Sequence, residues 1–104
     1  MGYNQDSFFQ LQSTDFFNAW FSRLDKSTRL LLLSRLDRVQ FGNLGDHKKI
    51  GPDLYELRCF FGGGLRVYFT LKEARVVLLL GGGKKSSQKH DIKAAEALLT
   101  QLET

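Results

Sequence analysis

The spacing of hydrophobic residues changes near the middle of the chain. Up to about residue 40 they recur at helical spacing. From Leu54 onward they alternate with polar residues, which is typical of strands. No repeat, linker or low-complexity segment interrupts the pattern. The sequence therefore predicts a single domain over residues 1–104, of the α+β class.

The first half of the chain is predicted to be mostly helical. The expected elements are a first strand at residues 8–12, a helix at residues 15–24 and a longer helix from about residue 26 to residue 40. Asp25 or Ser27 can cap the second helix, and Gly42 lies where a helix-ending residue with positive φ is expected. The short connection between the helices predicts an antiparallel helical hairpin.

The second half is predicted to be an antiparallel meander that ends in a helix. The expected elements are strands at residues 54–61, 65–71 and 75–80, a glycine turn at residues 62–64, and a last helix at residues 92–102. Glycines at residues 81–83 are expected to end the third strand, and Asp91 is expected to cap the last helix. Together with the first strand, this predicts a helical hairpin packed on a mainly antiparallel four-stranded sheet, followed by a C-terminal helix.

The predicted hairpin brings two arginines together. If its turn is centred on Gly62, Arg58 lies opposite Arg66 and Glu56 lies opposite Tyr68. Like charges directly opposed on a sheet are destabilising unless something compensates them. Glu56 can screen the pair as part of the structure, or the two guanidinium groups can receive a phosphate. Periodicity alone does not choose between these two interpretations.

Charge is concentrated in the same part of the chain. The formal net charge is +4, but residues 47–90 alone carry nine basic and three acidic residues. A modest positive charge is usually a solvated surface, whereas its concentration in one stretch favours an anionic partner. Cys59 is the single cysteine and falls on the apolar face of its strand, so it is interpreted as a core thiol in a reducing cytoplasm. No secretory signal or membrane-spanning stretch is evident, so no membrane partner is expected.

Two loops are expected to add to the positive surface, at residues 42–49 and 82–88. Each contains adjacent lysines and small residues that permit close backbone approach. The second loop lacks the spacing of a phosphate-binding P-loop, which excludes that type of nucleotide hydrolysis. His47 and His90 have no partner at metal-ligand spacing, so neither a metal nor another cofactor is expected.

An ordered set of short motifs resembles the addiction-module killer subgroup of the RelE/ParE toxin superfamily, which includes HigB-like and phage-derived members. The resemblance extends from about Phe8 to Leu99. The motifs are Phe17-x-x-Trp20, Arg35-Leu36-x-Arg38, Gly42-Asn43-x-Gly45-Asp46-x-Lys48, Glu56-Leu57-Arg58, Arg66-Val67-Tyr68-Phe69, Gly82-Gly83-x-Lys85-Ser86-Ser87-Gln88 and Asp91-Ile92-x-x-Ala95. No single motif is specific, but their order and separations are.

The resemblance implies the toxin of a type II toxin–antitoxin system. Many members of the superfamily enter the ribosome and cleave mRNA, and the implied cleavage needs no metal and uses the RNA 2′-hydroxyl as nucleophile. Its expected partners are the ribosome, mRNA and a cognate helix-turn-helix antitoxin, and its expected location is cytoplasmic. The protein would hold the scissile phosphate, stabilise its developing charge and handle two protons.

The resemblance also suggests which residues act. Arg66 matches the phosphate-binding arginine of the superfamily and is the strongest candidate. The expected catalytic residues are Arg66, Lys85, Arg58, Lys48 and Tyr68, and the expected RNA-binding residues are Lys49, Lys84, Gln88 and Lys89. The general base is not evident, and one hypothesis is a lysine whose pKa is lowered by its cationic neighbours.

One departure from the motif set leaves alternatives open. Lys84 stands where an acidic or amide residue is usual, which either adds RNA affinity or removes an anchor for Lys85. Residues 1–6 match no motif and are expected to fray. The alternative functions are inhibition of DNA gyrase, as in the ParE branch, and RNA binding without catalysis by a degenerate toxin.

Overall fold

The computed structural model describes residues 8–103, so the expected fraying of residues 1–6 lies outside the described part of the chain. The elements in chain order are β1 (Gln10–Ser13), α1 (Asp15–Ser22), α2 (Lys26–Gln40), β2 (His47–Lys49), β3 (Tyr55–Arg58), β4 (Leu65–Lys72), β5 (Val76–Lys84), a 3₁₀ turn η2 (Lys85–Ser87) and α3 (Gln88–Leu102).

The sheet has five strands in the order β1-β5-β4-β3-β2, so the predicted four-stranded sheet is wrong by one strand. The additional strand is β2, which the sequence placed in a loop because its three residues are all exposed and show no alternation. β1 runs parallel to β5, whereas the other neighbours are antiparallel. The sheet is therefore mixed, because α1 and α2 carry the chain away from β1 before the meander begins.

The last strand is longer than the glycine pattern predicted. β5 continues through residues 81–83 to Lys84, with a bulge opposite Tyr68 and Phe69. Side chains from both sides explain two of these glycines. A β-carbon on Gly82 would lie 2.5 Å from the ring of Trp20, and one on Gly83 would overlap the carboxylate of Asp91. These glycines are thus close-approach positions within a strand and do not end it.

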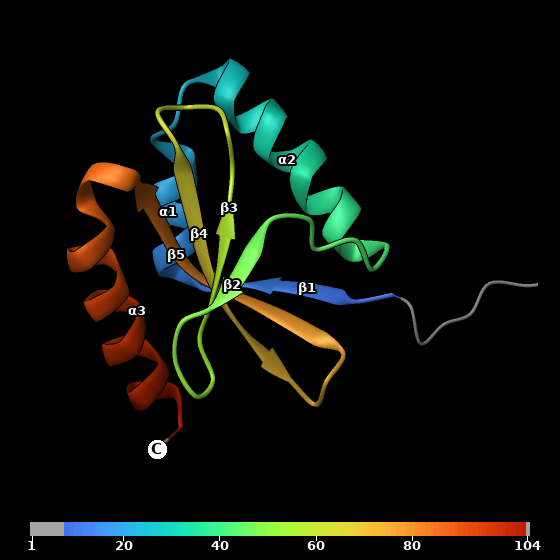
Figure 1. Ribbon diagram of the computed structural model, residues 1–104, viewed down its shortest axis with the longest axis vertical. Coiled ribbons are helices and arrows are strands. Elements are labelled where there is room, and N and C mark those ends of the chain that lie inside the picture. The colour runs from blue at the N-terminus through green and yellow to red at the C-terminus, as the bar shows by residue number, and fades with distance from the viewer. Residues whose placement is uncertain (1–7, 104) are drawn as a thin grey trace, which may run out of the picture.

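Helices cover both faces of the sheet, with α3 on one side and α2 on the other (Figure 1). α1 makes its close backbone approach to β5 and not to α2, so the two helices do not pack on each other as the predicted antiparallel hairpin requires. Thr14 fixes the start of α1, because its hydroxyl accepts from the Phe17 amide and donates to backbone oxygens of β5. Both helices then contribute to one core on the same sheet face.

Two hydrophobic cores result, one on each face. The core under α1 and α2 contains Phe17, Leu32, Leu36, Val39, Leu57, Cys59, Leu65, Val67, Phe69, Val77 and Leu79. The core under α3 contains Leu54, Tyr68, Leu80, Ala95 and Leu98. Cys59 is a buried thiol, as its position in the alternation predicted, and burial raises its pKa.

The C-terminal helix begins earlier than predicted. α3 starts at Gln88, directly after η2, and Ser87 occupies the cap position. Asp91 lies in the first turn of the helix and accepts a hydrogen bond from the Ser87 hydroxyl, so it is not the cap that the sequence suggested. The predicted start was wrong because polar residues 88–90 carry no apolar periodicity.

Candidate functional site

The face of the sheet that α3 partly covers carries two rows of residues aligned across the strands. One row joins Arg58 of β3, Arg66 of β4 and Gly83 of β5. The row beside it joins Lys48 of β2, Glu56 of β3, Tyr68 of β4 and Gly81 of β5. The register predicted from a turn centred on Gly62 is thus confirmed, and the two arginines are direct neighbours.

Glu56 lies at the centre of this surface and is fully buried. Its carboxylate accepts a 3.1 Å hydrogen bond from Arg58 Nε through one oxygen and a 2.6 Å hydrogen bond from Gln88 Nε2 through the other. A buried carboxylate is stable only when such donors replace its water. Glu56 therefore fixes the Arg58 side chain and joins the first turn of α3 to the sheet.

Arg66 is compensated differently from Arg58. Its Nε is buried and has no hydrogen-bond partner among the described residues, although the residue as a whole is only half-buried. Burying such a donor without a partner costs about 1–3 kcal/mol. Glu56 thus screens one arginine of the pair and leaves a guanidinium donor of the other unsatisfied, which is the arrangement expected of a site that receives an anion.

Tyr68 forms the floor of the surface. Its side chain is fully buried, and its hydroxyl makes no hydrogen bond among the described residues. Burial raises the pKa of Tyr68 well above its ordinary value, and the nearby carboxylate of Glu56 raises it further. A neutral, enclosed phenol supports the side chains above it, and it does not reach solvent in this arrangement.

The beginning of α3 borders the arginine pair. The Ser87 hydroxyl donates to Asp91 Oδ2, and both side chains lie over Gly83, which pairs with Arg66. Asp91 therefore places one carboxylate near the cationic row. The sequence singled out Asp91 only as a helix cap, because its proximity to β5 depends on how α3 docks.

The two lysines after the glycines separate. Lys85 lies in η2, is exposed, and donates its backbone N–H to Gly64 O over 3.0 Å at the tip of the β3–β4 hairpin. The Lys84 side chain runs beside Gly63. It lines a hollow with Arg23 and Thr28 on the face of the sheet that α1 and α2 cover. Lys85 is thus anchored to the hairpin through its backbone N–H. Lys84 belongs to a different surface from the arginine pair.

The remaining candidates divide in the same way. Lys48 shares the face of Glu56, whereas Lys49 points to the other face, where its Nζ lies 5.8 Å from the centre of the Tyr55 ring. Gln88 is occupied by its bond to Glu56, and Lys89 is exposed on α3. The structure therefore brings together Arg58, Arg66, Tyr68, Lys48 and Gln88, and it keeps Lys49 and Lys84 apart from them.

Among residues 8–103, no three histidine, cysteine, aspartate or glutamate side chains are grouped so that they could hold a metal ion. Within the same residues, no helix has the length and apolar character needed to span a membrane.

The chain is similar in sequence to known proteins. Residues 19–102 match the family described as phage derived protein Gp49-like. An uncharacterized protein of Haemophilus influenzae is 39% identical over 94 residues, which cover 89% of this chain and 95% of that protein.

Solved structures share its fold. A mutant of the Escherichia coli toxin RelE in the free state has a TM-score of 0.69 at 20% identity, covering 86% of this chain and 97% of that one. The intact E. coli RelBE toxin–antitoxin complex contains a chain with a TM-score of 0.57 at 18% identity, covering 73% and 95%. The architecture is thus a RelE-like α+β fold with a mixed five-stranded sheet and a C-terminal helix.

Proposed function

The chain belongs to the phage-derived Gp49-like family, and from this premise we propose that it is the toxin of a type II toxin–antitoxin system that cleaves mRNA on the ribosome. The RelE-like fold supports the toxin assignment, because the most similar architecture described above is that of a toxin. The HigB-like subgroup suggested by the motifs remains a prediction, as does the cytoplasmic location that an attack on ribosomes requires.

The observation that carries the proposal is the unequal treatment of the two arginines. Glu56 holds Arg58, while the neighbouring Arg66 has a buried Nε with no hydrogen-bond partner among residues 8–103. A phosphate between the two guanidinium groups would supply the missing acceptor. A purely structural cross-strand pair would be expected to satisfy both.

Cleavage through the RNA's own 2′-hydroxyl needs charge stabilisation and proton transfer from the protein. The 2′-oxygen bonds to the adjacent phosphorus, and the bond to the 5′-oxygen breaks, which leaves a cyclic phosphate and a 5′-hydroxyl. Negative charge grows on the phosphoryl oxygens during this step, so preorganised cationic donors lower its barrier. Arg66 and Arg58 fit this role, with Lys48 and Lys85 as additional cations at the border of the site.

Glu56 and Tyr68 have supporting roles in the proposed mechanism. Glu56 is fully buried and holds two donors, so it positions Arg58 and does not contact RNA. Tyr68 is enclosed beneath the same row, and its raised pKa keeps it neutral. The 2′-hydroxyl proton and the leaving oxygen are therefore left to groups at the exposed border of the site.

Primer extension on cellular mRNA after induction tests the proposal. The protein is expected to generate new transcript ends on translated mRNA, and Arg66→Ala is expected to remove them. Loss of one transition-state donor of this kind typically lowers the rate by about 100- to 1,000-fold.

Lys72→Ala is the matched control, since Lys72 is an exposed cation at the other end of the same strand. This variant should cleave like the wild type, and thermal unfolding should show that both variants are folded. Halted growth with intact transcripts and DNA-damage signalling would contradict the proposal and would indicate the gyrase inhibitor instead. Saturable, salt-dependent RNA binding without cleavage on ribosomes would indicate a degenerate toxin.

A cognate antitoxin is the proposed protein partner, by analogy with the RelBE complex. The reading frame beside the gene is expected to encode a small helix-turn-helix protein. Co-expression of that protein should restore growth. The protein should also co-purify with the chain at a fixed ratio.

A further inference from the structure

A cationic hollow lies on the α2 side of the β3–β4 hairpin, beside the loop that precedes β2. Its volume is about 260 Å³, and it is lined by Arg35, Arg38, Asn43, Gly45, Asp46, Arg58, Cys59, Phe60 and Phe61. Pockets for drug-sized ligands are usually about 300–1,000 Å³. This hollow is therefore large enough for a base or a phosphate group but small for a larger ligand.

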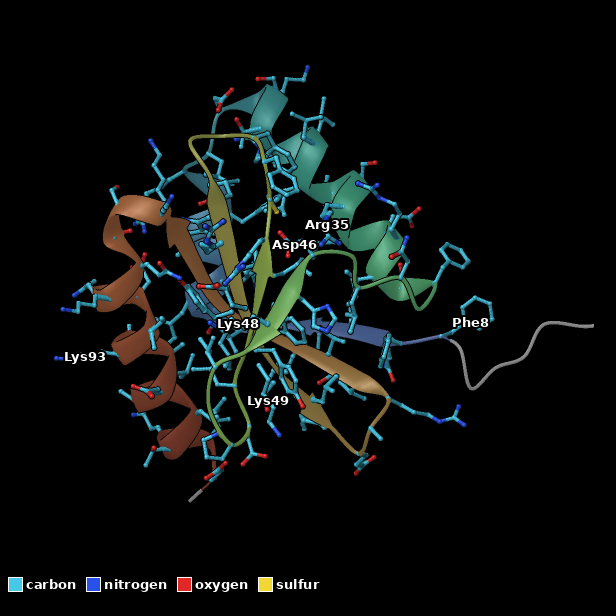
Figure 2. The ribbon with its side chains drawn as sticks, in the orientation of Figure 1. Phe8, Arg35, Asp46, Lys48, Lys49 and Lys93 are labelled. Carbon is cyan, nitrogen blue, oxygen red and sulfur yellow. The ribbon has the colours of Figure 1, made fainter. Side chains whose placement is uncertain are left out.

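Arg35 builds the wall of the hollow. It is a buried residue of α2, and its Nη2 donates to Leu44 O over 2.6 Å and to Asp46 O over 3.2 Å. Figure 2 shows Arg35 beside Asp46 of the loop before β2. Gly45, at φ +60°, lies against the guanidinium, where a β-carbon would come within 2.8 Å of Nη2. These contacts fix the loop, which accounts for Arg35 and the glycine–asparagine motif structurally.

The mouth of the hollow has no such structural explanation. Arg38 is exposed on α2, and Phe60 is 90% exposed at the hairpin tip, more than any other large hydrophobic side chain among residues 8–103. An isolated exposed hydrophobic residue needs no explanation, but Phe60 lines the same hollow as three arginines and a single acidic residue. An aromatic face beside arginines is how proteins bind single-stranded RNA, by stacking bases and binding phosphates.

We propose that this hollow is a nucleotide subsite for single-stranded RNA, with a base stacked on Phe60 and its phosphate held by Arg38 and Arg58. The inference rests on the proposed function, since it names a part of the same substrate. Arg58 connects the two regions, because its Nε is held by Glu56 beside Arg66 while the residue also lines the hollow. An RNA strand whose scissile phosphate lies at Arg66 thus continues along the hairpin to Phe60. Charge favours RNA over an apolar protein segment at this position.

Binding of a fluorescent single-stranded RNA oligonucleotide to the full chain tests the subsite without requiring cleavage. Phe60→Ala is expected to weaken affinity by roughly 5- to 100-fold, the usual effect of losing one base–aromatic stack. Arg38→Ala is expected to weaken it and to reduce its salt dependence, whereas Arg38→Lys should keep most of both. Phe16→Ala is the matched control, because Phe16 is 65% exposed on α1 and lies outside the hollow.

A double-mutant cycle identifies the stacked base. Oligonucleotides that lack one base at successive positions should include one that binds the wild type as weakly as the intact RNA binds Phe60→Ala. The same missing base should cause no further loss in Phe60→Ala. Equal RNA affinities for the wild type, Phe60→Ala and Arg38→Ala would overturn the subsite. So would losses that appear only in binding to the antitoxin, which would make this a protein contact.

The outcome is separable from that of the proposed function. If the wild type cleaves mRNA and Phe60→Ala binds RNA normally, the subsite is wrong and the enzyme assignment stands. If Phe60→Ala loses RNA affinity but the wild type cleaves nothing on ribosomes, the subsite stands and the enzyme assignment is wrong. A wild type that shows no saturable RNA binding would overturn the subsite.

Discussion

At the scale of single residues, the arginine pair shows how much one carboxylate decides. Glu56 has two oxygens, and both are occupied, one by Arg58 and one by Gln88. Neither oxygen accepts from Arg66, whose buried Nε has no hydrogen-bond partner among the described residues. The sequence predicted the pair and the carboxylate, but it could not predict that Gln88, 32 positions away, would take the second oxygen.

Tyr68 gives a prediction about pH. Its pKa in the folded protein lies above the ordinary value of 10.0, so the folded state holds the phenolic proton more tightly. The resulting stabilisation is fully present below about pH 10 and is lost as pH rises through the folded pKa. Urea unfolding at increasing pH above 10 should therefore show a falling free energy of unfolding.

Tyr68→Phe is the control, because it keeps the ring and removes a hydroxyl that has no hydrogen-bond partner within the described part of the chain. Its free energy of unfolding should decline less steeply above pH 10 than that of the wild type. The two proteins differ only at residue 68, so the difference between their pH curves reports the Tyr68 hydroxyl. Parallel pH curves for the two proteins would show that Tyr68 is not responsible.

At the scale of elements, the docking of α3 on β5 is the arrangement that completes the site. Ser87 and Asp91 of the helix start lie over Gly83, and Gln88 reaches Glu56. Ala95 and Leu98 then pack on Tyr68 and Leu80. The first turn of α3 is thus held by polar contacts to the site and the rest of the helix by apolar burial.

Gly83→Ala tests this docking. Its methyl group would overlap the Asp91 carboxylate, so the start of α3 must shift, at a cost of about 1–3 kcal/mol in the free energy of unfolding. Thermal unfolding measures the loss, and amide exchange in α3 should accelerate because its first turn no longer fits.

Gly81→Ala is the matched control in the same strand. A β-carbon there would meet no heavy atom within 4 Å, so its stability should remain within about 0.5 kcal/mol of the wild type. Equal destabilisation by both substitutions would mean that the glycines serve the strand itself and not the contact with Asp91.

At the scale of the whole molecule, positive charge is distributed over both sides of the β3–β4 hairpin. Arg66 and Lys48 lie on the α3 side, Arg38 lies on the α2 side, and Arg58 borders both. The hairpin therefore lies between two cationic surfaces. An RNA strand crossing it would contact several cations at once.

Salt dependence measures this distributed charge. Three or four phosphate contacts on single-stranded RNA predict a slope of about −2 to −3 for the logarithm of affinity against the logarithm of salt concentration. Arg66→Ala should reduce the magnitude of that slope by about 0.7, since one contact is lost. A slope near zero would contradict a phosphate-binding surface, whichever residues compose it.

Most of the secondary structure and one long-range feature were predictable. α2 begins and ends where its capping and glycine residues indicated, and the hairpin register around Gly62 followed from alternation and a short turn. β2 was missed because its three residues are all exposed, and the length of β5 was missed because glycines usually interrupt strands. Arg38 and Phe60 were not predicted as functional residues. Only their exposure at the hollow between α2 and the β3–β4 hairpin identifies them.

The sequence by itself determined what depends on neighbouring positions along the chain. Periodicity selected the faces of helices and strands, and the position of the turn set Arg58 opposite Arg66, because both follow from local backbone geometry. Only the tertiary structure decided which partner each charge has. Glu56 accepts a hydrogen bond from Gln88 of α3, Arg35 holds the loop around Gly45, and Lys84 lies across the sheet from the site. These contacts join segments distant in sequence, so they depend on how helices dock on the sheet and not on any local pattern.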